Sequence, residues 1–125
     1  MDIEDLPQTF KAVYRILRTK GRFTFTITHP CFDSLHARWS TDSSGTIKRE
    51  VYEYFKEGLW YSRNSNGMRG KIGAYHRTLS TYINALIQAG PTIEKVIEPE
   101  STQVEIEYIP RYAVIPIFLF MLARK

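Results

Sequence analysis

The 125-residue sequence contains a single cysteine, no zinc-type cluster of cysteine and histidine, and no apolar run of membrane-spanning length. One cysteine excludes an internal disulfide and is typical of a reducing compartment. The longest apolar run, residues 113–123, is interrupted by Pro116 and falls short of the roughly 20 residues that a membrane helix requires. Residues 1–5 are acidic, unlike the basic start of a signal peptide. We therefore expect a cytoplasmic protein without a metal ion or membrane contact.

The elements that can be recognised point to a single α/β domain over residues 1–125. Phe10, Val13, Tyr14 and Leu17 form one apolar stripe at helical spacing. This predicts a helix that begins after Asp5 and ends at Lys20-Gly21, where glycine is suited to a left-handed cap.

A second helix is predicted from Thr78, a good N-cap, to Ala89-Gly90. Its apolar stripe is expected to be core: Leu79, Tyr82, Ile83, Leu86 and Ile87.

Three strands are predicted. Residues 22–28 alternate between large apolar side chains and threonine, which is typical of a strand with one apolar and one semi-polar face. Residues 92–97 form a short second strand, and the continuous apolar run 117–123 predicts a strand buried on both faces. The helical crossover between the first two strands favours a parallel pair. The short polar connection before the third, with no helical pattern, favours an antiparallel one.

Residues 31–77 are poorly patterned and are predicted to be a long loop or lid inserted into this fold. Within them, residues 47–61 alternate charged and aromatic side chains, as in an extended or hairpin segment. Residues 48–77 hold seven basic against three acidic side chains, which equals the net charge of +4 of the whole chain. Basic residues interleaved with aromatics can form a nucleic-acid surface, so a non-enzymatic binding module that contacts nucleic acid or a protein is one hypothesis for function.

Four segments in order resemble the second half of class I S-adenosylmethionine-dependent methyltransferases. "YRILRTKGRFTFTITHPCF" (14–32) is similar to the helix, glycine turn and fifth strand of that family, and "YHRTLSTYINALIQAG" (75–90) to the following helix. "IEKVIEPE" (93–100) resembles strand six and "IPIFLFMLARK" (115–125) strand seven. One departure is Pro91, where the family usually has an aromatic residue. The resemblance implies a partial Rossmann-like methyltransferase sheet.

The half of the family fold that binds the cofactor has no counterpart in these residues. It requires a glycine-rich turn after strand one, so that the backbone can approach the cofactor closely. None of the seven glycines lies in a G-x-G pattern between a strand and a helix. The resemblance therefore implies a C-terminal, acceptor-side segment that uses S-adenosylmethionine only when completed by the cofactor-binding half, and whose enzymatic activity alone is in doubt.

The same resemblance implies how the chain would associate. In the complete family sheet, strand five pairs with strands four and seven, so residues 22–28 would have one bare edge. An exposed apolar edge is a template for pairing. We expect a homodimer, or an association with an N-terminal half, through this edge.

The candidate site residues follow from position. His29 lies just past the carboxyl end of a strand, where open α/β sheets bind ligands. It either faces a small-molecule methyl acceptor, as a catalytic base or hydrogen-bond partner, or only fixes the strand exit. The other candidates for acceptor binding are Trp60, Tyr61, Tyr75, His76 and Arg77, each of which could instead anchor the long loop. Cys31 is interpreted as a bystander, because methyl transfer from a sulfonium requires no enzyme thiol.

Overall fold

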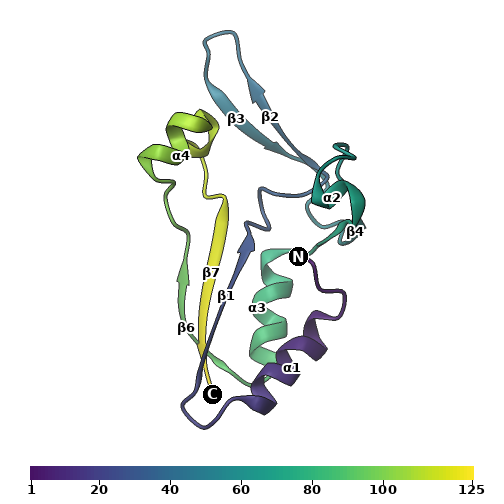
Figure 1. Ribbon diagram of the computed structural model, residues 1–125, viewed down its shortest axis with the longest axis vertical. Helices are drawn as coiled ribbons and strands as arrows, with labels where there is room; N and C mark the ends of the chain where they lie inside the picture. Colours follow the sequence, from purple (N-terminus) through teal and green to yellow (C-terminus); the bar gives the residue numbers. More distant parts are fainter.

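The computed structural model describes residues 1–125 and is elongated, with one three-stranded sheet along its length (Figure 1). The elements in chain order are α1 (Leu6–Ile16), β1 (Arg22–Thr28), β2 (Ala37–Thr41), β3 (Ile47–Val51), β4 (Gly58–Trp60), α2 (Met68–Lys71), β5 (Ala74–His76), α3 (Leu79–Gln88), β6 (Thr92–Ile97), α4 (Gln103–Tyr108), the 3-10 helix η1 (Pro110–Ala113) and β7 (Phe118–Arg124). None of the helices combines the length and apolar character needed to span a bilayer.

The main sheet has the order β1-β7-β6, and both of its ladders are antiparallel. The predicted parallel pair is therefore wrong. The chain passes through α3 and returns on the far side of β7, so β6 pairs with β7 and never with β1. The antiparallel setting of β7 is confirmed. Because β7 opposes both neighbours, β1 and β6 point in the same direction, and their carboxyl ends lie at the same end of the sheet.

Helices α1 and α3 lie side by side on one face of the sheet (Figure 1). The buried core lies between these helices and β7, with the apolar face of β1 packed against it. Its nine buried members are Leu6, Phe10, Tyr82, Ala85, Leu86, Ala89, Leu119, Met121 and Ala123. Tyr82 and Leu86 confirm the predicted stripe of α3, whereas Ile87 is 53% exposed and is not core.

The opposite face of the sheet is only partly buried. Along β7 the residues alternate: Leu119, Met121 and Ala123 are buried, Phe120 and Leu122 are half-buried, and Phe118 is 40% exposed. The prediction of a strand buried on both faces is therefore wrong for these residues. The reason is that both long helices lie on one side of the sheet, and no long helix lies on the other.

The helix boundaries follow local chemistry. Asp5 accepts a hydrogen bond from the Gln8 N–H at 2.9 Å, with Pro7 in the first turn of α1. Helix α1 ends at Ile16, earlier than predicted, and the left-handed residue is Lys20 rather than Gly21. Glycine is required at 21 for another reason, since a Cβ there would lie 2.7 Å from the Arg18 carbonyl oxygen.

Two regions hold more structure than the sequence predicted. Residues 31–77 contain the hairpin β2–β3, the pair β4–β5 and the short helix α2. Strand β3 lies in the segment predicted as extended, but its partner is residues 37–41 upstream. The connection before β7, predicted without helix, contains α4, which begins with a capping box between Thr102 and Glu105.

Candidate functional site

The candidate site lies at the carboxyl ends of β1 and β6. His29 follows β1 directly, and Glu98 follows β6 directly. Both strands run toward the end of the sheet from which the β2–β3 hairpin and α4 extend (Figure 1). Ligands of open α/β sheets bind outside the carboxyl ends of the strands, so this is the end at which a binding site is expected.

His29 and Glu98 contact each other across that end. The Nε2 atom of His29 lies 2.6 Å from Oε1 of Glu98, and Nδ1 accepts a hydrogen bond from the Cys31 N–H at 3.2 Å. Because Nδ1 accepts, the proton resides on Nε2 and is donated to the carboxylate. His29 is 1% exposed, whereas the Glu98 side chain is 52% exposed. The imidazole thus fixes the strand exit and orients a carboxylate that solvent or a ligand can reach.

His76 is also buried, at 2% exposed, and its Nε2 donates to the Tyr54 carbonyl oxygen at 2.7 Å. Arg77 donates to the Glu4 carbonyl oxygen and lies over the Tyr75 ring at 5.0 Å. These contacts join the residues before α3 to the N-terminal segment and to residue 54. Such contacts anchor the end of the 31–77 segment, which is the alternative to acceptor binding for His76 and Arg77.

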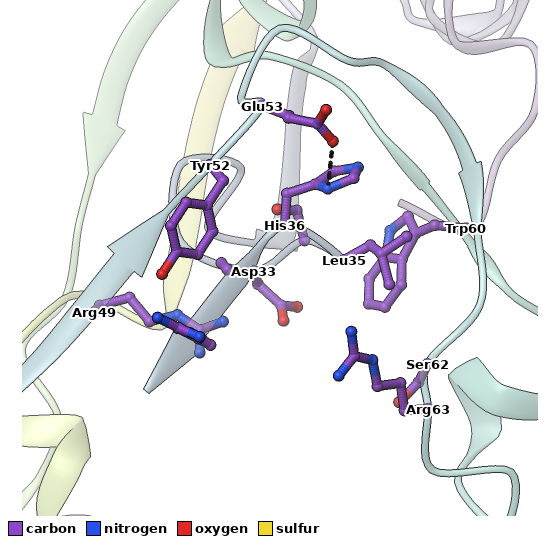
Figure 2. Close-up of a pocket in the computed structure, with 12 residues that line it drawn as sticks. Asp33, Leu35, His36, Arg49, Tyr52, Glu53, Trp60, Ser62 and Arg63 are labelled. Atoms are coloured by element: carbon purple, nitrogen blue, oxygen red, sulfur yellow. Dashed lines mark ion pairs between the residues drawn. The ribbon is translucent and has the colours of Figure 1, made fainter. Parts of the chain in front are cut away.

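The largest cavity has a volume of about 580 Å³ and lies beside the β2–β3 hairpin (Figure 2). Trp60 lines it together with Arg63 and the pair His36–Glu53, whose Nδ1 and Oε2 atoms are 3.0 Å apart. A smaller cavity of about 150 Å³ brings Trp60 and His76 together. Tyr61, with a side chain 51% exposed, lies on the surface.

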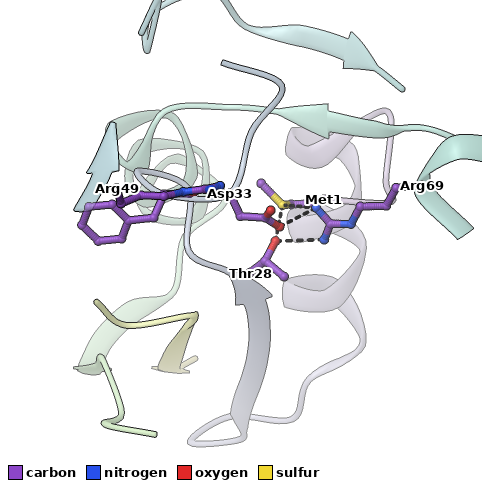
Figure 3. A network of polar contacts seen from close by, with 6 residues as sticks. Met1, Thr28, Asp33, Arg49 and Arg69 are labelled. Atoms are coloured by element: carbon purple, nitrogen blue, oxygen red, sulfur yellow. Dashed lines mark hydrogen bonds and ion pairs between the residues drawn. The ribbon is translucent and has the colours of Figure 1, made fainter. Parts of the chain in front are cut away.

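A polar network joins the 31–77 segment to the end of β1 (Figure 3). The Arg69 guanidinium donates to Asp33 Oδ2 at 2.6 Å and to Thr28 Oγ1 at 2.9 Å. It also approaches the Met1 sulfur at 3.7 Å, and the Thr28 hydroxyl contacts the same sulfur. Arg49 donates from Nε to the Phe32 carbonyl oxygen at 2.8 Å. Two arginines from one segment therefore hold the backbone that leaves β1.

A second cavity, of about 320 Å³, opens at this network between the end of β1 and the start of β7. Arg49, Arg69 and Arg111 line it beside Trp39, and it shares Asp33 and Arg49 with the largest cavity. None of these residues was singled out from the sequence. The turn signal Asp42-Ser43-Ser44-Gly45 could have indicated the hairpin that places Trp39 opposite Arg49, but Arg111 is brought there by tertiary structure alone.

The single thiol of the chain belongs to Cys31, and its side chain contacts Tyr54. Cys31 Sγ lies 3.6 Å from the Tyr54 hydroxyl, which also accepts the Leu79 N–H at 2.7 Å. Burial raises the pKa of Tyr54, although the bond from Leu79 opposes the shift. The Cys31 thiol thus donates to a phenol, and only the Cys31 backbone N–H contacts the His29 imidazole. Its interpretation as a bystander stays a prediction.

Two solved structures match this fold over 98% of its length. An S-adenosylmethionine-dependent methyltransferase from Mesorhizobium loti is 31% identical with a TM-score of 0.80, and a Listeria monocytogenes structure that bears the same family name is 33% identical with a TM-score of 0.77. The chain is thus similar in sequence and fold to part of these S-adenosylmethionine-dependent methyltransferases. It covers 57% and 55% of those two chains.

An uncharacterized protein of Haemophilus influenzae is 32% identical over 101 residues, which are 78% of this chain and 38% of that protein. No family model matches the sequence. The chain thus spans about half the length, or less, of the proteins that it resembles.

Proposed function

We propose that residues 1–125 are the C-terminal, acceptor-side half of an S-adenosylmethionine-dependent methyltransferase, completed by a cofactor-binding segment outside these residues. The observation that carries the proposal is the match of 98% of this chain to 57% of the Mesorhizobium loti structure. The cavities at the carboxyl end of β1 supply the place where a methyl acceptor would be held.

The residues present do not form a cradle for S-adenosylmethionine. Such a cradle needs a glycine whose missing Cβ leaves room for a ligand. At Gly70 a Cβ would lie 2.1 Å from the Asn64 carbonyl oxygen, and at Gly90 it would lie 2.9 Å from the Tyr14 ring. At these two positions the space is filled by the chain's own atoms. A Cβ at Gly45 or Gly58 would meet nothing within 4 Å, but these glycines lie in the β2–β3 turn and at the start of β4, not between a strand and a helix. We therefore derive no step through the cofactor from these residues.

The chemistry that remains for this half is positioning. Methyl transfer is a direct displacement, so holding the acceptor in line accounts for much of the catalysis. A base is needed only where the attacking atom carries a proton. Glu98, oriented by His29 and half-exposed at the sheet end, is the carboxylate that could accept that proton. In this proposal His29 is a positioning residue for Glu98.

A chimera tests the proposal. In the Mesorhizobium loti methyltransferase, the matching portion is replaced by residues 1–125, and binding of S-adenosylmethionine is measured by calorimetry. A folded chimera that binds the cofactor with an affinity close to that of the parent supports the proposal. A chimera that has native-like circular dichroism but no affinity for the cofactor contradicts it.

We further propose that the free edge of β1 is where the missing half, or a second copy, adds a strand. β1 pairs only with β7, and its other edge carries unpaired backbone groups. Sedimentation of the isolated chain should show self-association that a Thr26→Pro substitution at this edge abolishes. A stable monomer with a high melting temperature would contradict the pairing.

The nucleic-acid alternative has less support. Of the basic residues in 48–77, Lys48, Lys56 and Arg69 form ion pairs within the chain, with Asp42, Glu53 and Asp33 respectively. Strongly salt-dependent binding to single-stranded RNA would nevertheless favour it, because such binding reports on released counterions.

A further inference from the structure

The 320 Å³ cavity at the ends of β1 and β7 carries an excess of positive charge. Its charged lining residues are three arginines, Arg49, Arg69 and Arg111, against one acid, Asp33, which gives a net charge of +2. The positive charge of Arg69 is already balanced, because Arg69 forms an ion pair with Asp33 and also donates a hydrogen bond to Thr28. The remaining excess therefore belongs to Arg49 and Arg111.

Neither of these two arginines has an anionic partner in the chain. Arg49 makes one hydrogen bond, from Nε to the Phe32 carbonyl oxygen, and no ion pair. Arg111 makes neither a side-chain hydrogen bond nor an ion pair. Burial lowers the pKa of Arg49; Asp33 opposes this, and the charge of Arg111 lowers it further. An anion between the two guanidinium groups would remove their mutual repulsion.

The two arginines are held by the same aromatic ring. The antiparallel register of the hairpin pairs Trp39 with Arg49, and the Arg49 guanidinium lies 4.9 Å from the Trp39 ring centroid. Arg111 reaches the same ring from η1, at 5.8 Å. Cation–π contacts of this kind fix a guanidinium without using its N–H donors. Both arginines keep donors free for a ligand.

The cavity also has an apolar part, beside the polar groups of Thr28, Asp33 and Tyr112. Phe32, Ile115, Ile117 and Phe118 contribute hydrocarbon surface between the end of β1 and the start of β7. A site of roughly 300 Å³ or more with an apolar lining and a few convergent polar groups is of the kind that takes a small molecule. The ligand that fits this lining has an apolar body and one oxyanionic group.

We propose that this cavity binds a small organic oxyanion, a carboxylate or a phosphate monoester, through Arg49 and Arg111 beside Trp39. Arginine presents paired N–H donors that match the oxygens of both groups. The inference rests on the proposed function, since it makes this oxyanion the handle by which the methyl acceptor is held. Arg38 and Arg63 are not part of the site, because neither lines this cavity.

The test measures ligand binding by the fluorescence emission of Trp39, which lines the cavity. The chain has two tryptophans, and only Trp39 lines the second cavity. The substitution Trp60→Phe, outside that lining, therefore leaves Trp39 as the single indole. This variant is titrated with benzoate and with phenyl phosphate, and with benzamide as the neutral analogue of benzoate. We expect saturable changes of Trp39 emission with at least one anion, weakened by added salt, and none with benzamide. The two anions distinguish the carboxylate from the phosphate source.

Substitutions locate the binding. Arg111→Gln removes an exposed side chain without hydrogen bonds, so the fold should persist, and affinity should fall at least tenfold. Arg18→Gln, at an exposed position just before the start of β1, makes the same change of net charge and should leave affinity unchanged.

The inference is overturned if neither anion changes Trp39 emission or benzamide binds as tightly as benzoate. Equal affinity of Arg111→Gln and Arg18→Gln, with circular dichroism showing both to be folded, would also overturn it. The result is independent of the chimera experiment, which measures the cofactor and not the acceptor. A negative anion titration therefore contradicts only the oxyanion site, and a negative chimera experiment contradicts only the proposed function.

Discussion

Eight of the nine residues of the buried apolar core come from α1, α3 and β7, the ninth is Ala89 at the C-cap of α3, and none comes from residues 31–77. The helix–sheet region, by which we mean α1, β1, α3, β6 and β7, is held by apolar burial. The 31–77 segment is held by charge and aromatic contacts, such as Arg38 with Glu50 at 2.8 Å and Arg49 over Trp39 at 4.9 Å. Apolar burial is the stronger and less salt-sensitive force. The first region is thus the framework and the second carries the candidate ligand contacts.

The largest expected effect is in the core of the helix–sheet region. Leu86 in α3 is 0% exposed, and Leu86→Ala should lower the free energy of unfolding by about 2–5 kcal/mol. The neighbouring Ile87→Ala is the control, since Ile87 is 53% exposed and should cost much less. Urea denaturation followed by circular dichroism measures both. Equal losses for the two variants would contradict the placement of the core.

The second largest effect is expected at Arg69, whose hydrogen bonds connect the 31–77 segment to the end of β1. Arg69→Gln removes the charged hydrogen bonds to Asp33 and Thr28, and should destabilise the 31–77 segment by about 1 kcal/mol. Hydrogen exchange should accelerate in residues 31–77 while α3 stays protected. Arg63→Gln, at an exposed arginine of the same segment, should change neither. Equally faster hydrogen exchange over the whole chain would contradict this, because it would mean that the 31–77 segment unfolds together with the helix–sheet region.

The helix–sheet region could largely be predicted from the sequence, and the 31–77 segment could not. Residues 22–28 and 92–97 were predicted with the bounds that the structure has, because alternation and flanking turns report directly on a strand. Strand pairing was missed, since whether β6 lies beside β1 or beyond β7 depends on contacts between distant residues. Helix α4 was missed although Thr102 and Glu105 carry a capping signal.

The site residues divide in the same way. His29 was found because its place after a strand is a local feature, whereas its partner Glu98 is 69 residues away in the sequence and is brought to it by the sheet. Arg49, Arg69 and Arg111 meet at one cavity only after the hairpin and η1 are folded. Spacing in the sequence carries no signal for such a cluster. Trp60 lines the largest cavity and, together with His76, the cavity of about 150 Å³, and His29 lines neither of them.

A smaller effect lies where the 31–77 segment caps the framework. Glu57 accepts hydrogen bonds from the Thr78 N–H at 2.8 Å and from the Thr78 and Thr81 hydroxyls, so it caps α3 from outside the helix. Glu57→Ala should cost about 1 kcal/mol of stability. Glu100→Ala, at an exposed acid without a partner, is the control. Equal stability of the two variants would show that the cap is not used.

The same carboxylate predicts a pH dependence. Burial alone would raise the pKa of Glu57, but the hydrogen bonds from Thr81 and Thr78 outweigh it, and the pKa is lowered. Its contribution to stability is therefore present above the unfolded-state pKa of about 4.3 and is lost as the pH falls through the lower folded pKa. The difference in stability between wild type and Glu57→Ala should shrink over that acidic range. A constant difference would contradict the assignment.

The smallest effect is at the hairpin tip. Hydrogen bonds from Lys48 and Ser44 and from the Thr46 backbone lower the pKa of Asp42 to about 2. A pH titration of the Asp42 carboxyl carbon, followed by carbon-detected NMR, should have its midpoint at this pKa. Asp42→Asn should change the chemical shifts of the β2–β3 turn and leave global stability nearly unchanged, because the turn is exposed. An ordinary midpoint for Asp42 would show that the turn contacts do not persist in solution.

The central claim is that residues 1–125 supply the acceptor side of a methyltransferase and leave the cofactor to a segment outside them. Calorimetric titration of S-adenosylmethionine into the isolated chain, with the chimera as the positive control, tests this claim most directly. The account predicts no binding heat for the isolated chain and a saturable heat for the chimera. Micromolar affinity of the isolated chain for S-adenosylmethionine would contradict it.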